Sequence, residues 1–186
     1  MLGSHNSISY LKAIHWWQRW QKRWYKCQEH TIDEQLASGI RYFDIRLKII
    51  NNEWHFVHNK IDFGVENLDI YKSLNSIGNK VYVRFVLDER KHGSEEYRTK
   101  FLRHINWVKG YYPNIIVNSI ITAWDWREHE IPEIAERELH ASVNNSLIDY
   151  ILYGTKICRP IVIYPNIPIY NQYLIDNDKV LLVDYV

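Results

Sequence analysis

The feature that most constrains the fold is the run from Gly39 to Leu47, which is rich in β-branched and aromatic residues. These residue types favour a strand, and successive side chains of a strand point to opposite faces. One face of this run is apolar, whereas the other carries an acid and a base two residues apart, Asp44 and Arg46. Charges are seldom buried without partners, so we expect the polar face to open into a site. An edge strand with one wetted face is the alternative.

Two further strands are predicted to have one apolar face and one mixed face that ends in charge. Residues 81–88 carry Arg84 and Asp88, and residues 180–185 carry Asp184. Helical segments separate the strands, which favours an α/β fold with a largely parallel sheet. Inner faces of a closed parallel barrel become polar toward the catalytic end, whereas strands of an open doubly wound sheet are usually apolar on both faces. We therefore expect a distorted or trimmed TIM (β/α) barrel.

Composition narrows the class of protein. The 186 residues suit one sizeable core and contain no repeat or linker, so one domain over residues 1–186 is expected. The net charge of +1 gives no sign of a nucleic-acid partner, and no protein partner is predicted. Cys27 and Cys158 are too few for a disulfide framework and are expected to be reduced thiols. No transmembrane run or signal peptide is visible, which leaves the localisation open between peripheral membrane association and secretion after processing.

Periodicity and turn residues predict the other elements. Thr31 and Glu34 have the spacing of a capping box, which predicts a helix start at that point. The expected helices cover residues 9–28, 31–36, 66–77, 94–110 and 133–152, and the expected strands cover residues 1–4, 40–47, 53–58, 81–88, 115–123, 160–164 and 179–185.

The helix predicted over residues 9–28 concentrates tryptophan on one side. Trp16, Trp17, Trp20 and Trp24 fall within about a third of its circumference, and basic residues gather on another sector. A helix of this kind lies in a membrane interface, attracted by anionic lipid. Packing of the indoles onto the barrel is the alternative.

Ionisable residues gather where strands are predicted to end, which is where barrel enzymes place their active sites. Two histidines, an arginine and a carboxylate can cleave a phosphodiester. One imidazole takes the nucleophile's proton, the other protonates the leaving oxygen, and a guanidinium holds the phosphoryl oxygens. The candidates are His5, Asp44, Arg46, His58, Arg84, Asp88 and Asp184.

Three ordered motifs resemble the catalytic X region of the phosphatidylinositol-specific phospholipase C family. They are Leu2-Gly-Ser-His-Asn-Ser7, the run from Thr31 to Arg46, and Phe56-Val-His58. The terminal run from Val180 to Tyr185 is similar to the closing strand of that family. The resemblance implies a distorted TIM barrel, in agreement with the strand pattern.

The resemblance also implies roles for individual residues. His5 matches the general base that takes the proton from the inositol 2-hydroxyl, and Asp184 matches the carboxylate that orients this base. His58 matches the general acid that protonates the diacylglycerol oxygen. Arg46 matches the phosphate-clamping arginine of bacterial members, where eukaryotic members have a calcium-binding aspartate. Asp44 matches an acid of both branches. No cofactor or metal is therefore expected, with Ca²⁺ as the fallback.

The implied reaction is intramolecular attack on phosphatidylinositol or a related phospholipid at a membrane surface, giving a 1,2-cyclic inositol phosphate and diacylglycerol. Two positions depart from the family pattern: Asn6 replaces the acid that supports the general acid in bacterial members, and Asn59 replaces a glycine. We expect Asn6, Arg84 and Asp88 to bind substrate. For Arg84, a salt bridge to Asp44 or Asp88 is the alternative.

Three other functions remain open from the sequence. A glycerophosphodiesterase-like barrel needs a Glu-x-Asp pair for magnesium, and Arg46 stands at the second acidic position. A lipid-binding module without turnover is consistent with Asn6 and with the short chain. Binding of single-stranded nucleic acid by the aromatic helix is the weakest alternative, because the net charge is near zero.

Overall fold

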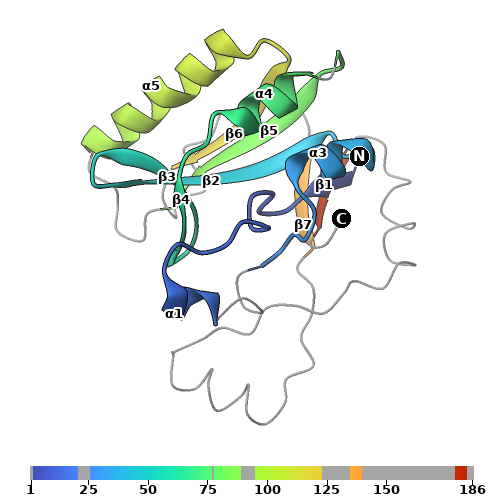
Figure 1. The fold of residues 1–186 in the computed structure, drawn as a ribbon. Helices are drawn as coiled ribbons and strands as arrows, with labels where there is room; N and C mark the ends of the chain where they lie inside the picture. Colours follow the sequence, from blue (N-terminus) through green and yellow to red (C-terminus); the bar gives the residue numbers. More distant parts are fainter. Residues whose placement is uncertain are drawn as a thin grey trace.

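The computed structural model describes residues 2–20, 26–76, 78–88, 95–122, 135–139 and 179–183 (Figure 1). Within these residues eight strands form one sheet, in the order β4-β3-β2-β1-β8-β7, with β5 on β2 and β6 on β5. The strands are β1 (Leu2–Ser4), β2 (Tyr42–Ile50), β3 (Glu53–His58), β4 (Ile61–Val65), β5 (Val81–Leu87), β6 (Ile115–Thr122), β7 (Ala135–Leu139) and β8 (Lys179–Val183). The helices are α1 (Trp16–Arg19), α3 (Ile32–Ala37), α4 (Asp69–Ser76) and α5 (Glu95–Tyr111).

Strand β2 is the centre of the sheet, because it pairs with three neighbours. Its first half runs parallel to β5 along one edge, from Tyr42 to Leu47. On the other edge it runs parallel to β1, with Phe43 opposite Ser4. Farther along that same edge it pairs antiparallel with β3, with Leu47 opposite Phe56. The stretch of β2 between these two neighbours contains Asp44.

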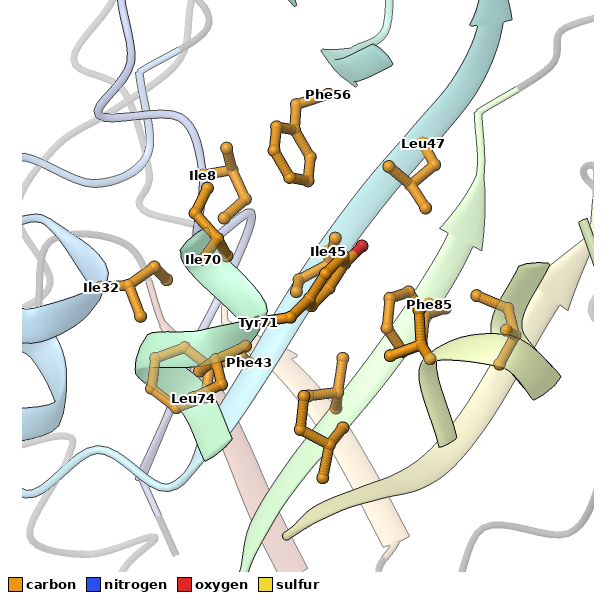
Figure 2. Packing of buried hydrophobic residues seen from close by; sticks show 14 of the residues in the cluster. Ile8, Ile32, Phe43, Ile45, Leu47, Phe56, Ile70, Tyr71, Leu74 and Phe85 are labelled. Carbon is orange, nitrogen blue, oxygen red and sulfur yellow. The ribbon is translucent and has the colours of Figure 1, made fainter. Parts of the chain in front are cut away.

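The apolar face predicted for β2 is confirmed. Phe43, Ile45 and Leu47 are fully buried in the hydrophobic core. The alternate residues of β5 join them, and α4 covers this face through Tyr71 and Leu74 (Figure 2). Helix α5 packs on the same side of β5 and β6 (Figure 1). The opposite face of β2 carries the charged side chains of Asp44 and Arg46.

The capping box predicted at α3 is confirmed. The Thr31 hydroxyl accepts the Glu34 backbone N–H, and the Glu34 carboxylate accepts the Thr31 backbone N–H. Gly39 follows the helix with φ of 90°, a conformation that glycine adopts without steric cost. The chain then enters β2, which pairs with β1 and β5 from Tyr42 onward.

The helix predicted over residues 9–28 is wrong. Only Trp16–Arg19 is helical in the described part of this segment. Upstream of it, the Ser9 hydroxyl accepts the backbone N–H groups of Cys27 and Gln28. Such tertiary bonds, together with burial of apolar residues before Trp16, override an amphipathic helical pattern.

Two other elements differ from the prediction. The helix predicted over residues 133–152 is wrong at Ala135–Leu139, which forms β7. Strand β4 was not predicted, because its five residues include a glycine and a register irregularity opposite Phe56 and Val57. The strand predicted over residues 160–164 lies outside the described residues.

The fold is mixed α/β. Six strands pair in parallel in the order β7-β8-β1-β2-β5-β6, and β3 and β4 extend β2 as an antiparallel hairpin. Among the described strands no pairing joins β6 to β7, so a closed barrel is not seen there. No described helix is long and apolar enough to span a bilayer.

Candidate active site

The charged face of β2 is organised around Asp44, whose carboxylate is fully buried. Arg84 binds it through two nitrogens, with Nε 3.0 Å from Oδ1 and Nη2 2.9 Å from Oδ2. Arg46 binds Oδ2 through Nε at 3.2 Å and Nη2 at 3.1 Å. The backbone N–H of Asn6 donates to the same oxygen at 3.0 Å. One carboxylate thus holds two guanidinium groups.

Strand register explains why these residues meet. Asp44 and Arg84 are direct partners across the β2–β5 ladder, and Arg46 is two residues farther along the same face of β2. Burial alone would raise the pKa of Asp44, but the Arg46 and Arg84 guanidiniums outweigh burial and hold this pKa well below its usual range. The carboxylate is therefore ionised and is paired with both guanidinium groups.

His5 joins this cluster from the end of β1. Its Nε2 lies 2.8 Å from Nη2 of Arg46 and 3.8 Å from Oδ2 of Asp44. A guanidinium can only donate hydrogen bonds, so Nε2 of His5 accepts and the ring in this arrangement carries its proton on Nδ1. An imidazole with an unprotonated nitrogen beside a cation can take a proton from a hydroxyl group.

The turn from His5 to Tyr10 is fastened to β2 by serine. Ser7 donates its backbone N–H to the Asp44 carbonyl at 2.8 Å, and its hydroxyl accepts the Asp44 backbone N–H at 2.9 Å. The same hydroxyl donates to the Ser4 carbonyl at 2.8 Å. These bonds continue the pairing of β1 with β2 beyond the strand and set His5 beside Asp44. Sequence reasoning did not assign Ser7 a role, although it stands in the first quoted motif.

Asn6 is the one residue of this turn with an unexplained side chain. Both polar atoms of its amide are buried and have no hydrogen-bond partner in the described structure. A buried polar group without a partner calls for an explanation, and a substrate that arrives later is one. Its φ of 44° is a conformation that asparagine tolerates better than most residues.

His58 ends β3 and contacts a different set of residues. Its Nδ1 lies 4.0 Å from Sγ of Cys27. The next residue, Asn59, donates its backbone N–H to Oδ2 of Asp88 at 2.6 Å. Asp88 therefore fastens the turn that follows His58 and does not join the Asp44 cluster through any recorded bond.

Strand register places His5 but not His58 relative to Asp44. His5 follows Ser4, which pairs with Phe43, so it comes in at the level of Asp44. His58 lies two residues beyond Phe56, where the pairing of β3 with β2 ends, and the β3–β4 ladder has a register shift between Phe56 and Val57.

The predicted site residues thus divide into three sets. His5, Asn6, Asp44, Arg46 and Arg84 are brought together by recorded bonds, and for Arg84 the salt bridge to Asp44 is the arrangement found. His58 and Asp88 lie at the β3–β4 turn. Asp184 and Trp24 lie outside the described residues.

The tryptophans around α1 are exposed. Trp16, Trp17 and Trp20 show 66%, 52% and 80% of their surface. Gln18, between them, donates its amide N–H to the Lys60 carbonyl at 2.8 Å and accepts the Asp62 backbone N–H at 3.3 Å. The exposed indoles are therefore fastened to the hairpin turn that follows His58.

The site lacks a cluster of metal ligands among the described residues. Within the described ranges no group of three or more His, Cys, Asp or Glu side chains is placed to hold a metal ion. Asp44, which lies 3.8 Å from His5, is already bound by two guanidinium groups.

Comparison with known proteins finds similar solved structures. The phosphatidylinositol-specific phospholipase C of Listeria monocytogenes is 14% identical, with 100% of this chain and 87% of that chain covered and a TM-score of 0.57. A double mutant of the Staphylococcus aureus enzyme is 15% identical, with 100% and 84% covered and a TM-score of 0.64. Another structure of the Staphylococcus aureus enzyme, from work on modulation of its membrane binding, is 14% identical, with 100% and 85% covered and a TM-score of 0.55.

No protein-family model matches the sequence, and comparison with curated proteins finds no match. Identities of this size establish a likeness of fold. The chain is therefore similar in fold to the bacterial phosphatidylinositol-specific phospholipases C.

Proposed function

We propose that this protein cleaves the phosphodiester of phosphatidylinositol or a related phospholipid. The observation that carries the proposal is the buried cluster in which Asp44 holds Arg46 and Arg84 while Arg46 donates to Nε2 of His5. This cluster combines guanidinium groups that can bind a phosphate with an imidazole able to accept a proton, and the likeness of fold to bacterial phospholipases C supports the proposal.

In the proposed reaction, His5 removes the proton of the inositol 2-hydroxyl, whose oxygen attacks the adjacent phosphorus. Arg46 binds the phosphoryl oxygens as negative charge builds on them. His58 gives a proton to the departing diacylglycerol oxygen, so that a 1,2-cyclic inositol phosphate and diacylglycerol are the products. The reaction as written needs no metal ion.

Asp184 completes the proposed site as the carboxylate that orients His5. Strand register supports this assignment, because Val183, the residue before Asp184, pairs with Ser4, the residue before His5. We assign Asn6 and Arg84 to substrate binding, with Arg84 acting through the charge that it contributes beside Asp44. Asp88, which binds the turn after His58, is also assigned to substrate binding.

The proposed architecture is a distorted barrel. In it, β6 and β7, which lie on either side of residues 123–134 in the sequence, would form the two edges at which the ring closes. The proposed orientation at a membrane places Trp16, Trp17 and Trp20 in the lipid interface, together with Trp24. Their exposure and their attachment to the turn after His58 support this orientation. It would hold the candidate site against the surface that contains the substrate.

A lipid-binding module without turnover is the second candidate. The unpartnered amide of Asn6 supports it, because an acid at this position would give better support to a protonated histidine. Such a module would bind phosphatidylinositol through Arg46 without cleaving it.

The two candidates separate in one assay on vesicles that contain phosphatidylinositol. The phosphodiesterase releases water-soluble inositol phosphate, and the rate falls by about 10² to 10⁴ in His5→Ala and in His58→Ala, as expected for loss of a general base or acid. His30→Ala is the matched control, because the His30 side chain is 56% exposed and binds only Glu34 in the recorded contacts.

The outcomes are distinct. If the unaltered protein sediments with the vesicles but releases no inositol phosphate, the result would favour the lipid-binding module. Release that disappears with EDTA would overturn the metal-free mechanism and favour a glycerophosphodiesterase-like reaction. Equal release by His5→Ala and the unaltered protein would remove His5 from the site.

A further inference from the structure

Two consecutive residues, Cys27 and Gln28, contact both histidines of the proposed site. The side-chain amide of Gln28 donates to the His5 carbonyl at 2.9 Å. Sγ of Cys27 lies 4.0 Å from Nδ1 of His58. Cys27 carries a reduced thiol, and all four residues are buried. This pair therefore connects the end of β1 with the end of β3.

The pair is held in place by Ser9. Its hydroxyl oxygen accepts the backbone N–H of Cys27 at 2.8 Å and that of Gln28 at 2.9 Å. Ser9 in turn donates its backbone N–H to the carbonyl of Asn6 at 2.9 Å, within the turn that contains His5. Because every one of these groups is buried, the position of the thiol is fixed relative to the Asp44 cluster.

We infer that Cys27 is a positioning residue that holds the ring of His58 in the orientation of a general acid. The inference rests on the proposed function, in which His58 protonates the leaving oxygen. In the neutral ring, the thiol donates its proton to Nδ1 and the ring proton resides on Nε2. In the protonated ring, Nδ1–H points to sulfur and Nε2 again carries a proton. The protonated ring is the general acid, because it becomes a neutral imidazole when Nε2 gives its proton to the leaving oxygen, and the contact of Nδ1 with sulfur keeps Nε2 directed toward that oxygen.

The kinetic test uses two substrates with different leaving groups. Diacylglycerol leaves phosphatidylinositol as an alkoxide and needs a proton, whereas nitrophenolate leaves a nitrophenyl ester of inositol phosphate without one. We expect Cys27→Ala to lower turnover of phosphatidylinositol by about tenfold with KM unchanged, and to change turnover of the nitrophenyl ester by less than about twofold. Cys27→Ser, which keeps a hydrogen-bonding group, should restore most of the loss. Cys158→Ala is the control for removal of a thiol.

A second measurement does not need activity. Nitrogen NMR of the histidine rings reports which ring nitrogen of neutral His58 carries the proton. The unaltered protein and Cys27→Ser should show the Nε2–H tautomer for His58, and Cys27→Ala should shift the population toward Nδ1–H.

The results separate the two proposals. If the unaltered protein cleaves neither substrate, the proposed function fails, and the tautomer of His58 alone decides the inference about Cys27. Equal losses on both substrates in Cys27→Ala would show a general structural defect and overturn the inference. An unchanged tautomer in Cys27→Ala would overturn it as well.

Discussion

At the scale of single residues, the candidate site depends on one buried carboxylate that compensates two buried or half-buried cations. Arg84 is 1% exposed, so its guanidinium has almost no access to water and takes its compensation from Asp44. Removing one partner of such a pair leaves an uncompensated charge in a medium of low dielectric constant. Asp44 is therefore both part of the proposed chemistry and a condition for folding.

Asp44→Asn should lower the free energy of unfolding by about 3 to 5 kcal/mol, the usual cost of breaking a buried ion pair from one side. Urea denaturation followed by tryptophan fluorescence measures the change. Asp69→Asn is the matched control, because Asp69 pairs with Lys72 where both side chains are about two-thirds exposed, and exposed pairs contribute little. Equal effects of the two substitutions would contradict the buried cluster.

The same carboxylate gives stability a defined dependence on pH. Burial acts to raise the pKa of Asp44, but Arg46 and Arg84 prevail and hold it well below the usual value of 3.8. A depressed folded-state pKa contributes stability that is complete above the unfolded value and is lost as the pH falls through the folded value. The difference in unfolding free energy between the unaltered protein and Asp44→Asn should thus be constant near neutral pH and shrink below about pH 4. A difference that stays constant down to pH 2 would contradict the ionised carboxylate.

Sequence reasoning could find the charged residues of the site but not all of their partners. Asp44 and Arg46 stand out because alternation within a strand puts both charges on one face, and this argument needs only neighbours in the chain. The contact of Cys27 with His58 has no such local signal. The contact depends on the hydrogen bond from the backbone N–H of Cys27 to the hydroxyl of Ser9, and these two residues lie far apart in the sequence.

At the scale of elements, sequence patterns correctly predicted those helices and strands whose local preference agrees with the tertiary contacts that they make. Strand β3 has the predicted bounds, and α5 differs from its predicted bounds by one residue at each end. The capping box at Thr31 was also correct. The helix predicted over residues 9–28 failed because its one serine, Ser9, accepts the backbone N–H groups of Cys27 and Gln28 at the far end of the segment. The asparagine of the Asn59–Lys60 turn was the available sequence signal for the missed hairpin to β4. In the structure Asn59 has a φ of 56°, which asparagine tolerates.

Gly64 is the residue of β4 that permits the segment before α1 to lie against the hairpin. Its φ is 105°, and a Cβ at this position would lie 3.2 Å from a side-chain carbon of Ile14. Gly64→Ala should therefore lower the free energy of unfolding by about 1 to 3 kcal/mol, from backbone strain together with the close contact. Thermal denaturation measures the loss.

Gly110 provides the opposite control. It lies in the last turn of α5, and nothing is within 4 Å of a Cβ built there. Gly110→Ala should raise stability by up to about 1 kcal/mol, because alanine loses less backbone entropy in a helix. A stabilising effect of Gly64→Ala would show that the hairpin and Ile14 do not pack as described.

At the scale of the whole molecule, the exposed indoles and the candidate site are linked through one hairpin turn. Gln18 of α1 bonds to Lys60, and Asn59 of the same turn follows His58 and bonds to Asp88. A membrane that takes up the indoles would therefore meet the molecule beside the end of β3. This arrangement would give the proposed lipid contact and the candidate site a fixed relation.

Replacing Trp16, Trp17 and Trp20 together with alanine should weaken binding to vesicles of phosphatidylinositol and phosphatidylcholine by at least about tenfold, which corresponds to about 1.4 kcal/mol. The measurement is made in the His5→Ala background so that the lipid is not consumed. Stability should change little, because all three side chains are more than half exposed.

Trp107→Ala is the matched control for a tryptophan elsewhere on the surface. Its side chain is 38% exposed on α5 and stacks on His104. It should leave vesicle affinity within about twofold, since no further indole of comparable exposure accompanies it in the described structure. Equal losses from this substitution and from the triple replacement would contradict a membrane contact centred on α1.

Phosphorus NMR of phosphatidylinositol vesicles incubated with the protein tests the central claim most directly, because cyclic and open phosphate esters resonate at different positions. We expect a new resonance of a 1,2-cyclic inositol phosphate with the unaltered protein and with His30→Ala, and none with His5→Ala. A phosphatidylinositol resonance that stays unchanged with the unaltered protein, while the protein sediments with the vesicles, would contradict the claim that the cluster of His5, Asp44 and Arg46 breaks a phosphodiester.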